Sequence, residues 1–193
     1  KGFQLPGSSL WLLPPANHTL STVLPCLIDK TSKQFGSPHR FIPHITLSSE
    51  ITASKHEPDP QAWLDSLDLP PIKDVIVKFE RLGSEDVFFR KLYIKCEKLD
   101  GIKQLAKQSR KQVDGFEEES KAKAWAEDEY NPHLSLMYHD IPQIDDTGLA
   151  SVDLLGVNLD GTGDLGGWTG GRVVIVPTDK SIDQWQPIGE RVF

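Results

Sequence analysis

The sequence contains 193 residues, of which 38% are hydrophobic and 25% are charged, and its formal net charge is −7. This length suits one domain, or two small lobes that share a core. No apolar run approaches the roughly 20 residues of a membrane-spanning helix, so we expect no membrane insertion. The acidic balance argues against binding of long nucleic acid, which requires a basic surface.

Cysteine usage and the start of the chain both bear on location. Cys26 and Cys96 form no CxxC pattern and are too few for a disulfide framework. We interpret them as free thiols in a reducing compartment. The chain starts without the apolar stretch of a secretory signal. We therefore expect a cytoplasmic or otherwise intracellular protein that is not secreted.

Hydrophobic periodicity in the first part of the chain predicts alternating strands and helices. Apolar residues recur at helical spacing between Leu20 and Ile28, which favours an amphipathic helix. Asp59 before Pro60 is typical of a helix N-terminus. The expected elements are a strand over 8–13, a helix from residue 20 that Pro25 kinks or begins, a strand over 41–49 and a helix from Pro60 onward.

The rest of the chain predicts a hairpin, a helix and a further motif-bearing strand. The charged segment 116–129 shows no clear apolar face, and we interpret it as a solvated helix or a mobile loop that Trp125 pins. Glycines on both sides of Trp168 indicate a tight turn or a close backbone approach. The expected elements are strands over 74–82 and 87–96, a helix over 99–113, a strand over 133–138, a short helix over 147–155 and a last strand over 167–177.

One motif occurs twice, as “FIPHITL” and as “YNPHLSL”. Each copy reads aromatic, any residue, Pro, His, aliphatic, hydroxyl, Leu, and each follows a predicted helix. Because side chains alternate between the two faces of a strand, His44 and Thr46 share one face, as do His133 and Ser135. The repeat indicates an internal duplication in which each strand buries an aliphatic row and presents a polar row.

Two histidines and two hydroxyls on neighbouring strands suit metal-free cleavage of a phosphodiester. If a pseudo-twofold axis relates the strands, the four side chains converge on one cleft. One imidazole can accept a proton while the other donates one, and the hydroxyls can donate hydrogen bonds to phosphate oxygens. The alternative is structural: two half-buried histidines bonded to nearby hydroxyls. No His or Cys pair has the spacing of a metal site, so we expect no metal and no other cofactor.

The stretches “PHITLSS” and “PHLSLMY” resemble the paired H-x-T/S motifs of the two-histidine (2H) phosphoesterase superfamily. The arrangement is most similar to the fungal and plant 2′,3′-cyclic nucleotide 3′-phosphodiesterase family, over nearly the whole chain. The resemblance implies an α+β, bilobal fold over residues 1–193, with helices outside. Two mostly antiparallel sheet halves, related by pseudo-twofold symmetry, would enclose a central cleft. It further implies that His44 and His133 are the acid–base pair and that Thr46 and Ser135 bind phosphate.

The resemblance also implies a substrate class. The expected substrates are nucleoside 2′,3′-cyclic phosphates, opened to nucleoside 2′-phosphates, or ADP-ribose 1″,2″-cyclic phosphate, in RNA metabolism such as tRNA splicing. By analogy with the plant enzymes, His133 activates water and His44 protonates the leaving oxygen, although the motif spacing does not decide this. We expect a monomer, and association with endomembranes stays open. Two alternatives remain: a phosphodiesterase of the same superfamily that acts on RNA 3′ ends or 2′-5′ oligonucleotides, and a nucleotide-binding module without catalysis.

Tyr138 and Trp168 are further candidate substrate-binding residues, because an aromatic ring can stack on a nucleobase. Core packing is the alternative for both. Arg40, Arg90 and Arg172 either supply a positive rim or form surface salt bridges. A basic helix face, which is either solvated or contacts RNA, consists of Lys103, Lys107, Arg110 and Lys111.

Overall fold

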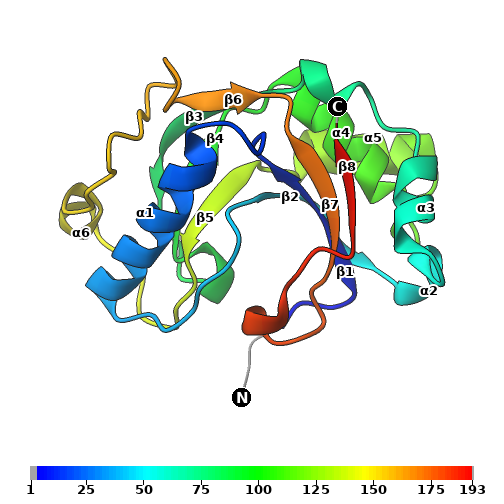
Figure 1. Ribbon diagram of the computed structural model, residues 1–193. Helices are drawn as coiled ribbons and strands as arrows, with labels where there is room; N and C mark the ends of the chain where they lie inside the picture. Colours follow the sequence, from blue (N-terminus) through cyan, green and yellow to red (C-terminus); the bar gives the residue numbers. More distant parts are fainter. Residues whose placement is uncertain (1–3, 193) are drawn as a thin grey trace.

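The computed structural model describes residues 4–192, which form one curled antiparallel sheet with helices packed against it (Figure 1). The strands are β1 (Ser8–Leu13), β2 (Ile45–Ile51), β3 (Ile76–Gly83), β4 (Leu92–Cys96), β5 (His133–Met137), β6 (Gly167–Thr169), β7 (Arg172–Pro177) and β8 (Gly189–Val192). The α-helices are α1 (Leu20–Phe35), α2 (Ala53–His56), α3 (Pro60–Ser66), α4 (Asp100–Arg110), α5 (Glu119–Asp128) and α6 (Asp146–Ala150). Short 3-10 helices are η1 (Ile72–Asp74), η2 (Phe88–Arg90) and η3 (Ile182–Gln184).

The sheet has two halves, β6-β3-β4-β5 and β2-β1-β7-β8, and the strand order runs through both. They meet where β5 pairs with β2 in antiparallel fashion, through Ile45 and Leu134. The expected α+β class with two antiparallel halves is confirmed, and the halves are joined edge to edge into one sheet. The two strands that carry the repeated motif are therefore neighbours at its centre.

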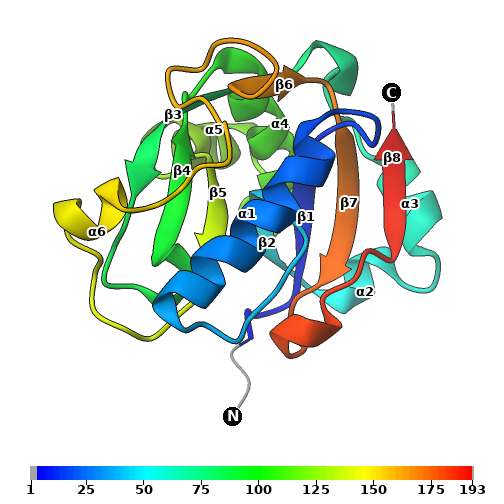
Figure 2. The same cartoon turned by 60° about the vertical axis from the view of Figure 1, so that its left-hand side comes forward.

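The main hydrophobic core lies on one face of the sheet. Helix α1, which connects β1 to β2, packs over β5 of the other half of the sheet, and α4, which follows β4, packs over β2 of the other half. Figure 2 shows α1 running diagonally across the strands. The central strands contribute fully buried aliphatic residues at alternate positions, as the period of a strand requires. They are Leu10 and Leu12 of β1, Ile45 and Leu47 of β2, and Leu134 and Leu136 of β5.

A smaller apolar cluster covers part of the opposite face. It contains the remaining alternate residues of β1 and β7 together with aromatic residues from the loops that follow β5 and β7. Its buried members are Trp11, Leu13, Tyr138, Val174, Val176, Ile182 and Trp185. This cluster covers His44, which stacks on Trp11 and is 5% exposed, whereas His133 is only half-buried.

Of the two interpretations of the charged segment 116–129, the helix is correct for residues 119–128, where α5 forms. Its alanines 122 and 126 are fully buried. Trp125 holds the segment in place, because the guanidinium of Arg110 lies between its ring, at 4.7 Å, and that of Phe116, at 4.1 Å. Such cation–π contacts stabilise the packing of α5 on α4.

Three expected strands are wrong in part. The strand expected over 41–49 begins only at Ile45, so His44 directly precedes it. The strand expected over 87–96 begins only at Leu92, because Phe88 and Phe89 turn in η2 and pack into the aromatic cluster. The strand expected over 167–177 is two strands, of which β6 pairs with β3 and β7 pairs with β1. The edge strand β8 was not expected, because its residues are mostly polar and alternate between half-buried and exposed.

The turn between β6 and β7 confirms the close backbone approach that the glycines indicated. Gly171 has φ +122°, and a Cβ atom there would overlap the backbone oxygen of Leu13. Gly171→Ala is expected to lower the free energy of unfolding by about 1–3 kcal/mol, since it adds backbone strain and a steric overlap. Urea denaturation measures this change. Gly115→Ala is the matched control, because Gly115 has φ +92° with nothing within 4 Å of the added Cβ; an equal loss in both variants would contradict the role of the overlap.

Candidate active site

The pairing of β2 with β5 brings the two motif copies together. Ile45 lies opposite Leu134, and in each copy a histidine precedes this residue while a hydroxyl residue follows it. In an antiparallel pair, the residue before one partner faces the residue after the other. Each histidine therefore lies beside the hydroxyl residue of the other copy. The neighbours are His44 with Ser135 and His133 with Thr46.

These four side chains share the face of the sheet that points away from the main core. Ile45 and Leu134 lie in that core, and strand side chains alternate. The two histidines are diagonal neighbours, and such positions lie roughly 7–8 Å apart. This spacing leaves room for one phosphate group between two imidazoles.

The Pro-His dipeptide of each copy fixes the tautomer of its imidazole. In His44, Nδ1 lies 2.6 Å from the backbone oxygen of Ile42, and in His133, Nδ1 lies 3.0 Å from that of Asn131. A carbonyl only accepts, so Nδ1 donates in both rings and Nε2 is left for chemistry. The acceptor in each case is the residue before the proline, which proline restricts to an extended conformation.

The aromatic residue that opens each copy contacts the other copy. The Tyr130 hydroxyl donates to the backbone oxygen of Thr46 at 3.0 Å. The Phe41 ring stacks on that of Tyr138, with centroids 3.9 Å apart. These contacts add to the single backbone pairing that joins the two halves of the sheet.

Both imidazoles are neutral in the free protein near neutral pH. His44 is 5% exposed and stacks on Trp11, with ring centroids 3.6 Å apart and planes 9° from parallel. Burial lowers the pKa of His44 to about 3, against the opposing effect of the Ile42 carbonyl. Burial also lowers the pKa of His133, and the positive charge of Arg90 lowers it further.

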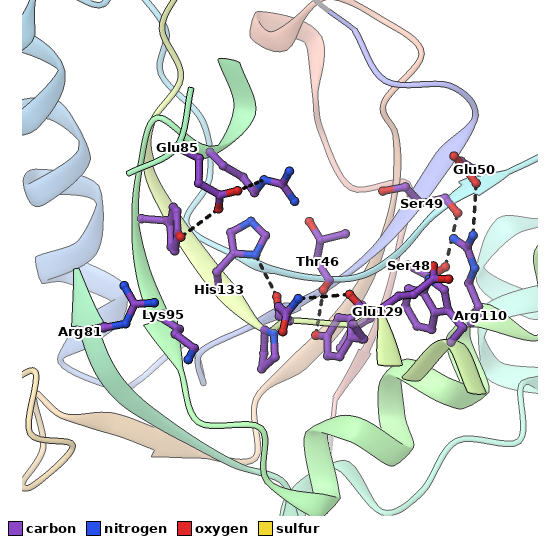
Figure 3. Close-up of a pocket in the computed structure, with 17 residues that line it drawn as sticks. Thr46, Ser48, Ser49, Glu50, Arg81, Glu85, Lys95, Arg110, Glu129 and His133 are labelled. Atoms are coloured by element: carbon purple, nitrogen blue, oxygen red, sulfur yellow. Dashed lines mark hydrogen bonds and ion pairs between the residues drawn. The ribbon is translucent and has the colours of Figure 1, made fainter. Parts of the chain in front are cut away.

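A cavity of about 460 Å³ lies beside His133 and Thr46, which is within the range of small-molecule sites. Figure 3 shows both side chains pointing to the same side of the strands, with Glu85 next to the His133 ring. The wall carries basic, acidic and aromatic groups. They include Glu85, Arg90, Tyr93, Lys95, Arg110 and Trp125. His44 and Ser135, each 5% exposed, lie on the same face but do not line this cavity, so the four side chains are adjacent without all opening into it.

The structure does not bring the two aromatic candidates into this cavity. Trp168 is 4% exposed on β6, where its ring edge meets Phe79 and its indole nitrogen donates to the backbone oxygen of Gly170. It packs in the main core and does not line the cavity beside His133, so its position does not support stacking on a nucleobase there. Tyr138 is 3% exposed and follows β5, within the aromatic cluster next to Ser135.

The three arginines considered as a positive rim separate into two groups. Arg40 is bound to Asp29 at 3.0 Å, and Arg172 lies 3.5 Å from Glu190. These two line a different cavity, and only Arg90 of the three lines the cavity beside His133. The basic face expected on α4 is paired with carboxylates and is largely covered, because its side chains are only 12–30% exposed: Lys103 lies beside Glu127, Lys107 and Lys111 beside Glu119, and Arg110 beside Glu50.

Two residues that contact the histidines were not among the sequence candidates. Trp11 stacks on His44, and the ring edge of Tyr93 meets His133 at a centroid distance of 5.3 Å. Each occupies the same face of its strand as the histidine that it touches. Strand alternation predicts which residues of one strand share a face. The pairing of Trp11 with Thr46 and of Tyr93 with Ser135, which decides that these faces coincide, could not be read from the sequence.

The fold places the protein in a known structural class. A crystal structure of Escherichia coli LigT complexed with 3′-AMP matches with a TM-score of 0.54, covering 99% of both chains at 12% sequence identity. This likeness supports the 2H phosphoesterase fold, in agreement with the paired motifs on adjacent strands.

The chain belongs to the cyclic phosphodiesterase-like protein family, whose model matches residues 6–193. It is 62% identical over 191 residues to a 2′,3′-cyclic-nucleotide 3′-phosphodiesterase of Phaeosphaeria nodorum, covering 97% of this chain and 99% of the relative. It is 39% identical over 212 residues to a protein of the same name from Neurospora crassa, covering 98% and 100%.

Proposed function

We propose that this protein hydrolyses nucleoside 2′,3′-cyclic phosphates to nucleoside 2′-phosphates, as a 2′,3′-cyclic-nucleotide 3′-phosphodiesterase. The observation that carries the proposal is the arrangement of His44, Thr46, His133 and Ser135 on one face of the paired strands β2 and β5. The names of the fungal relatives support the same activity.

The reaction requires a base for water, an acid for the 3′ oxygen and donors for the phosphoryl oxygens. Nε2 of one histidine accepts a proton from water, whose oxygen attacks phosphorus. The other histidine protonates the 3′ oxygen as its bond to phosphorus breaks. Two imidazoles related by a pseudo-twofold axis can flank the phosphate for in-line displacement. The hydroxyls of Thr46 and Ser135 donate to the non-bridging oxygens.

We assign the base to His133 and the acid to His44. His44 is neutral in the free protein, because burial lowers its pKa to about 3. An acid role therefore requires proton uptake when substrate binds. The negative phosphate raises the pKa of a neighbouring histidine, and the Trp11 face stacked on the ring favours a cation.

The test is incubation with 2′,3′-cyclic AMP in the presence and absence of EDTA. We expect 2′-AMP at the same rate in both, because two histidines supply both proton transfers. Within residues 4–192 there is no group of three or more His, Cys, Asp or Glu side chains that could hold a metal ion. Product analysis by chromatography separates 2′-AMP from 3′-AMP.

Each other outcome contradicts a stated part of the proposal. Intact substrate contradicts the activity, 3′-AMP contradicts the choice of leaving oxygen, and activity that EDTA removes and a metal restores contradicts the mechanism. A His133→Ala preparation purified in parallel controls for contaminating nucleases.

The substrate that we propose is a mononucleotide, or ADP-ribose cyclic phosphate, such as arises in RNA metabolism and tRNA splicing. The ion pairs along the basic face of α4 and the net charge of −7 argue against a long RNA. Comparing kcat/KM for cyclic mononucleotides with that for oligonucleotides ending in a cyclic phosphate distinguishes these substrates.

We further propose that residues 1–193 work as one bilobal catalytic domain and as a monomer, since each half of the sheet supplies one histidine of the same chain. The free thiols of Cys26 and Cys96 support a cytoplasmic location. No helix within residues 4–192 has the length and apolar character needed to cross a membrane.

A further inference from the structure

Arg90 lies where the proposed reaction needs a positive charge. It ends η2, and its side chain lines the cavity together with His133 and Thr46. The side chain is 47% exposed, and its Nε lies 3.5 Å from Oε1 of Glu85. A well-formed charged hydrogen bond is shorter, about 2.7–2.9 Å. Guanidinium has five N–H donors, so Arg90 retains donors for a second anion.

The η2 turn is attached to the active site from two sides. The Ser135 hydroxyl donates to the backbone oxygen of Phe89 at 3.2 Å, directly before Arg90. The Tyr93 hydroxyl donates to Glu85 at 2.9 Å, while the Tyr93 ring edge meets His133. The phosphate-binding hydroxyl, the base and the arginine are therefore held in one connected unit.

Charge also argues for Arg90. In the free protein the four motif residues offer neutral hydroxyls and neutral imidazoles, and the one proton that His44 takes up with substrate is passed to the leaving oxygen, whereas opening of the cyclic phosphate concentrates negative charge on the non-bridging oxygens. Guanidinium matches the geometry of a phosphate better than any other side chain. Figure 3 shows Glu85, the partner of Arg90, beside the His133 ring on the side to which that ring points. Arg90 is close enough for its charge to lower the pKa of His133.

We propose that Arg90 exchanges Glu85 for a non-bridging oxygen of the reacting phosphate and is thus a further catalytic residue. This inference rests on the proposed cyclic phosphodiesterase activity. Glu85 acts as a resting partner that holds the guanidinium at the cavity until substrate arrives. Ser135 undergoes a matching exchange, from the Phe89 carbonyl to the phosphate.

The experiment separates a phosphate contact from simple neutralisation of Glu85. It compares kcat and KM for 2′,3′-cyclic AMP in Arg90→Gln, Arg90→Lys, Glu85→Gln and the double variant Arg90→Gln/Glu85→Gln. We expect Arg90→Gln to lower kcat/KM by about 10- to 100-fold, and Arg90→Lys to recover part of it. Because Glu85 positions Arg90 in the free protein, Glu85→Gln measures the loss of that positioning, and we expect the double variant to stay as low as Arg90→Gln.

Arg40→Gln is the matched control, because Arg40 is bound to Asp29 and lines a different cavity; its activity is expected to be unchanged. Recovery of wild-type kcat/KM in the double variant would overturn the inference, as would an Arg90→Gln variant that matches Arg40→Gln. Calorimetric binding of 2′-AMP tests the contact without turnover. If the wild type turned nothing over but Arg90→Gln bound 2′-AMP at least tenfold more weakly, the proposed function would fail and the phosphate contact would stand. Equal 2′-AMP affinity would reject the contact.

Discussion

Alanine at His44 or at His133 is expected to lower kcat for 2′,3′-cyclic AMP by about 10²–10⁴, the usual contribution of one general acid or base. Each variant removes one of the two proton transfers, and among residues 4–192 no histidine other than His133 lines the cavity. Steady-state kinetics on purified variants measures the loss. Far-UV circular dichroism and thermal unfolding show that the variants are folded.

His18→Ala is the control for this series, because His18 lies at the start of α1 and away from the motif strands. It should keep wild-type kcat. The double variant His44→Ala/His133→Ala should lose about as much as the more impaired single variant, since groups that act as a unit are not additive. A folded His133→Ala protein with wild-type kcat would remove the basis for acid–base catalysis by this pair.

The centre of the site could be predicted from the sequence because two local rules suffice there. Strand alternation assigns His44 and Thr46 to one face, and the repeated motif assigns His133 and Ser135 to the equivalent face of a second strand. The duplicated pattern then implies a symmetric pairing, which the Ile45–Leu134 register has. Neither rule needs knowledge of the rest of the sheet.

The surroundings of the site depend on contacts that no local pattern encodes. Trp168 was a candidate because an aromatic ring can stack on a nucleobase, but it stands among glycines, and a Cβ at Gly167 would overlap the backbone of Val77. Those glycines let β6 approach β3. Trp11, which does contact His44, is hidden in an apolar run, where its neighbours give no sign of a polar partner.

The η2 turn shows tertiary packing overriding strand propensity. Phe88 and Phe89 are strong strand formers, and the sequence continues into a real strand at Leu92. Instead, Phe89 stacks on Trp185 at a centroid distance of 5.9 Å, and Phe88 lies 6.2 Å from Tyr138. This packing turns the chain so that the Phe89 carbonyl and Arg90 reach the active site, a placement that periodicity alone could not give.

Acid is expected to destabilise the protein through His44. The pKa of His44 is about 3 in the folded state, against an ordinary value of 6.5. Between these limits the unfolded chain binds a proton that the folded chain does not, so the free energy of unfolding falls as the pH falls. The free energy of unfolding falls by about 2 kcal/mol on going from pH 7 to pH 5 and by roughly 4 kcal/mol at pH 3, and the loss is complete only below pH 3.

Urea denaturation at pH 7, 6 and 5 measures this dependence, and His44→Gln isolates the contribution of one ring. His133 has a lowered pKa as well, so the wild type should lose more than His44 alone accounts for, and the variant should keep the remaining slope. An identical pH dependence in the wild type and in His44→Gln would contradict this prediction, because it would show that the pKa of His44 is the same in the folded and unfolded states. Added 2′-AMP should reduce the loss in the wild type, because a phosphate beside His44 favours the imidazolium that burial otherwise excludes. Burial thus keeps the His44 ring neutral in the free protein, and the ring gains its proton only when a phosphate is bound beside it. His44 would therefore be charged when it has a leaving oxygen to protonate.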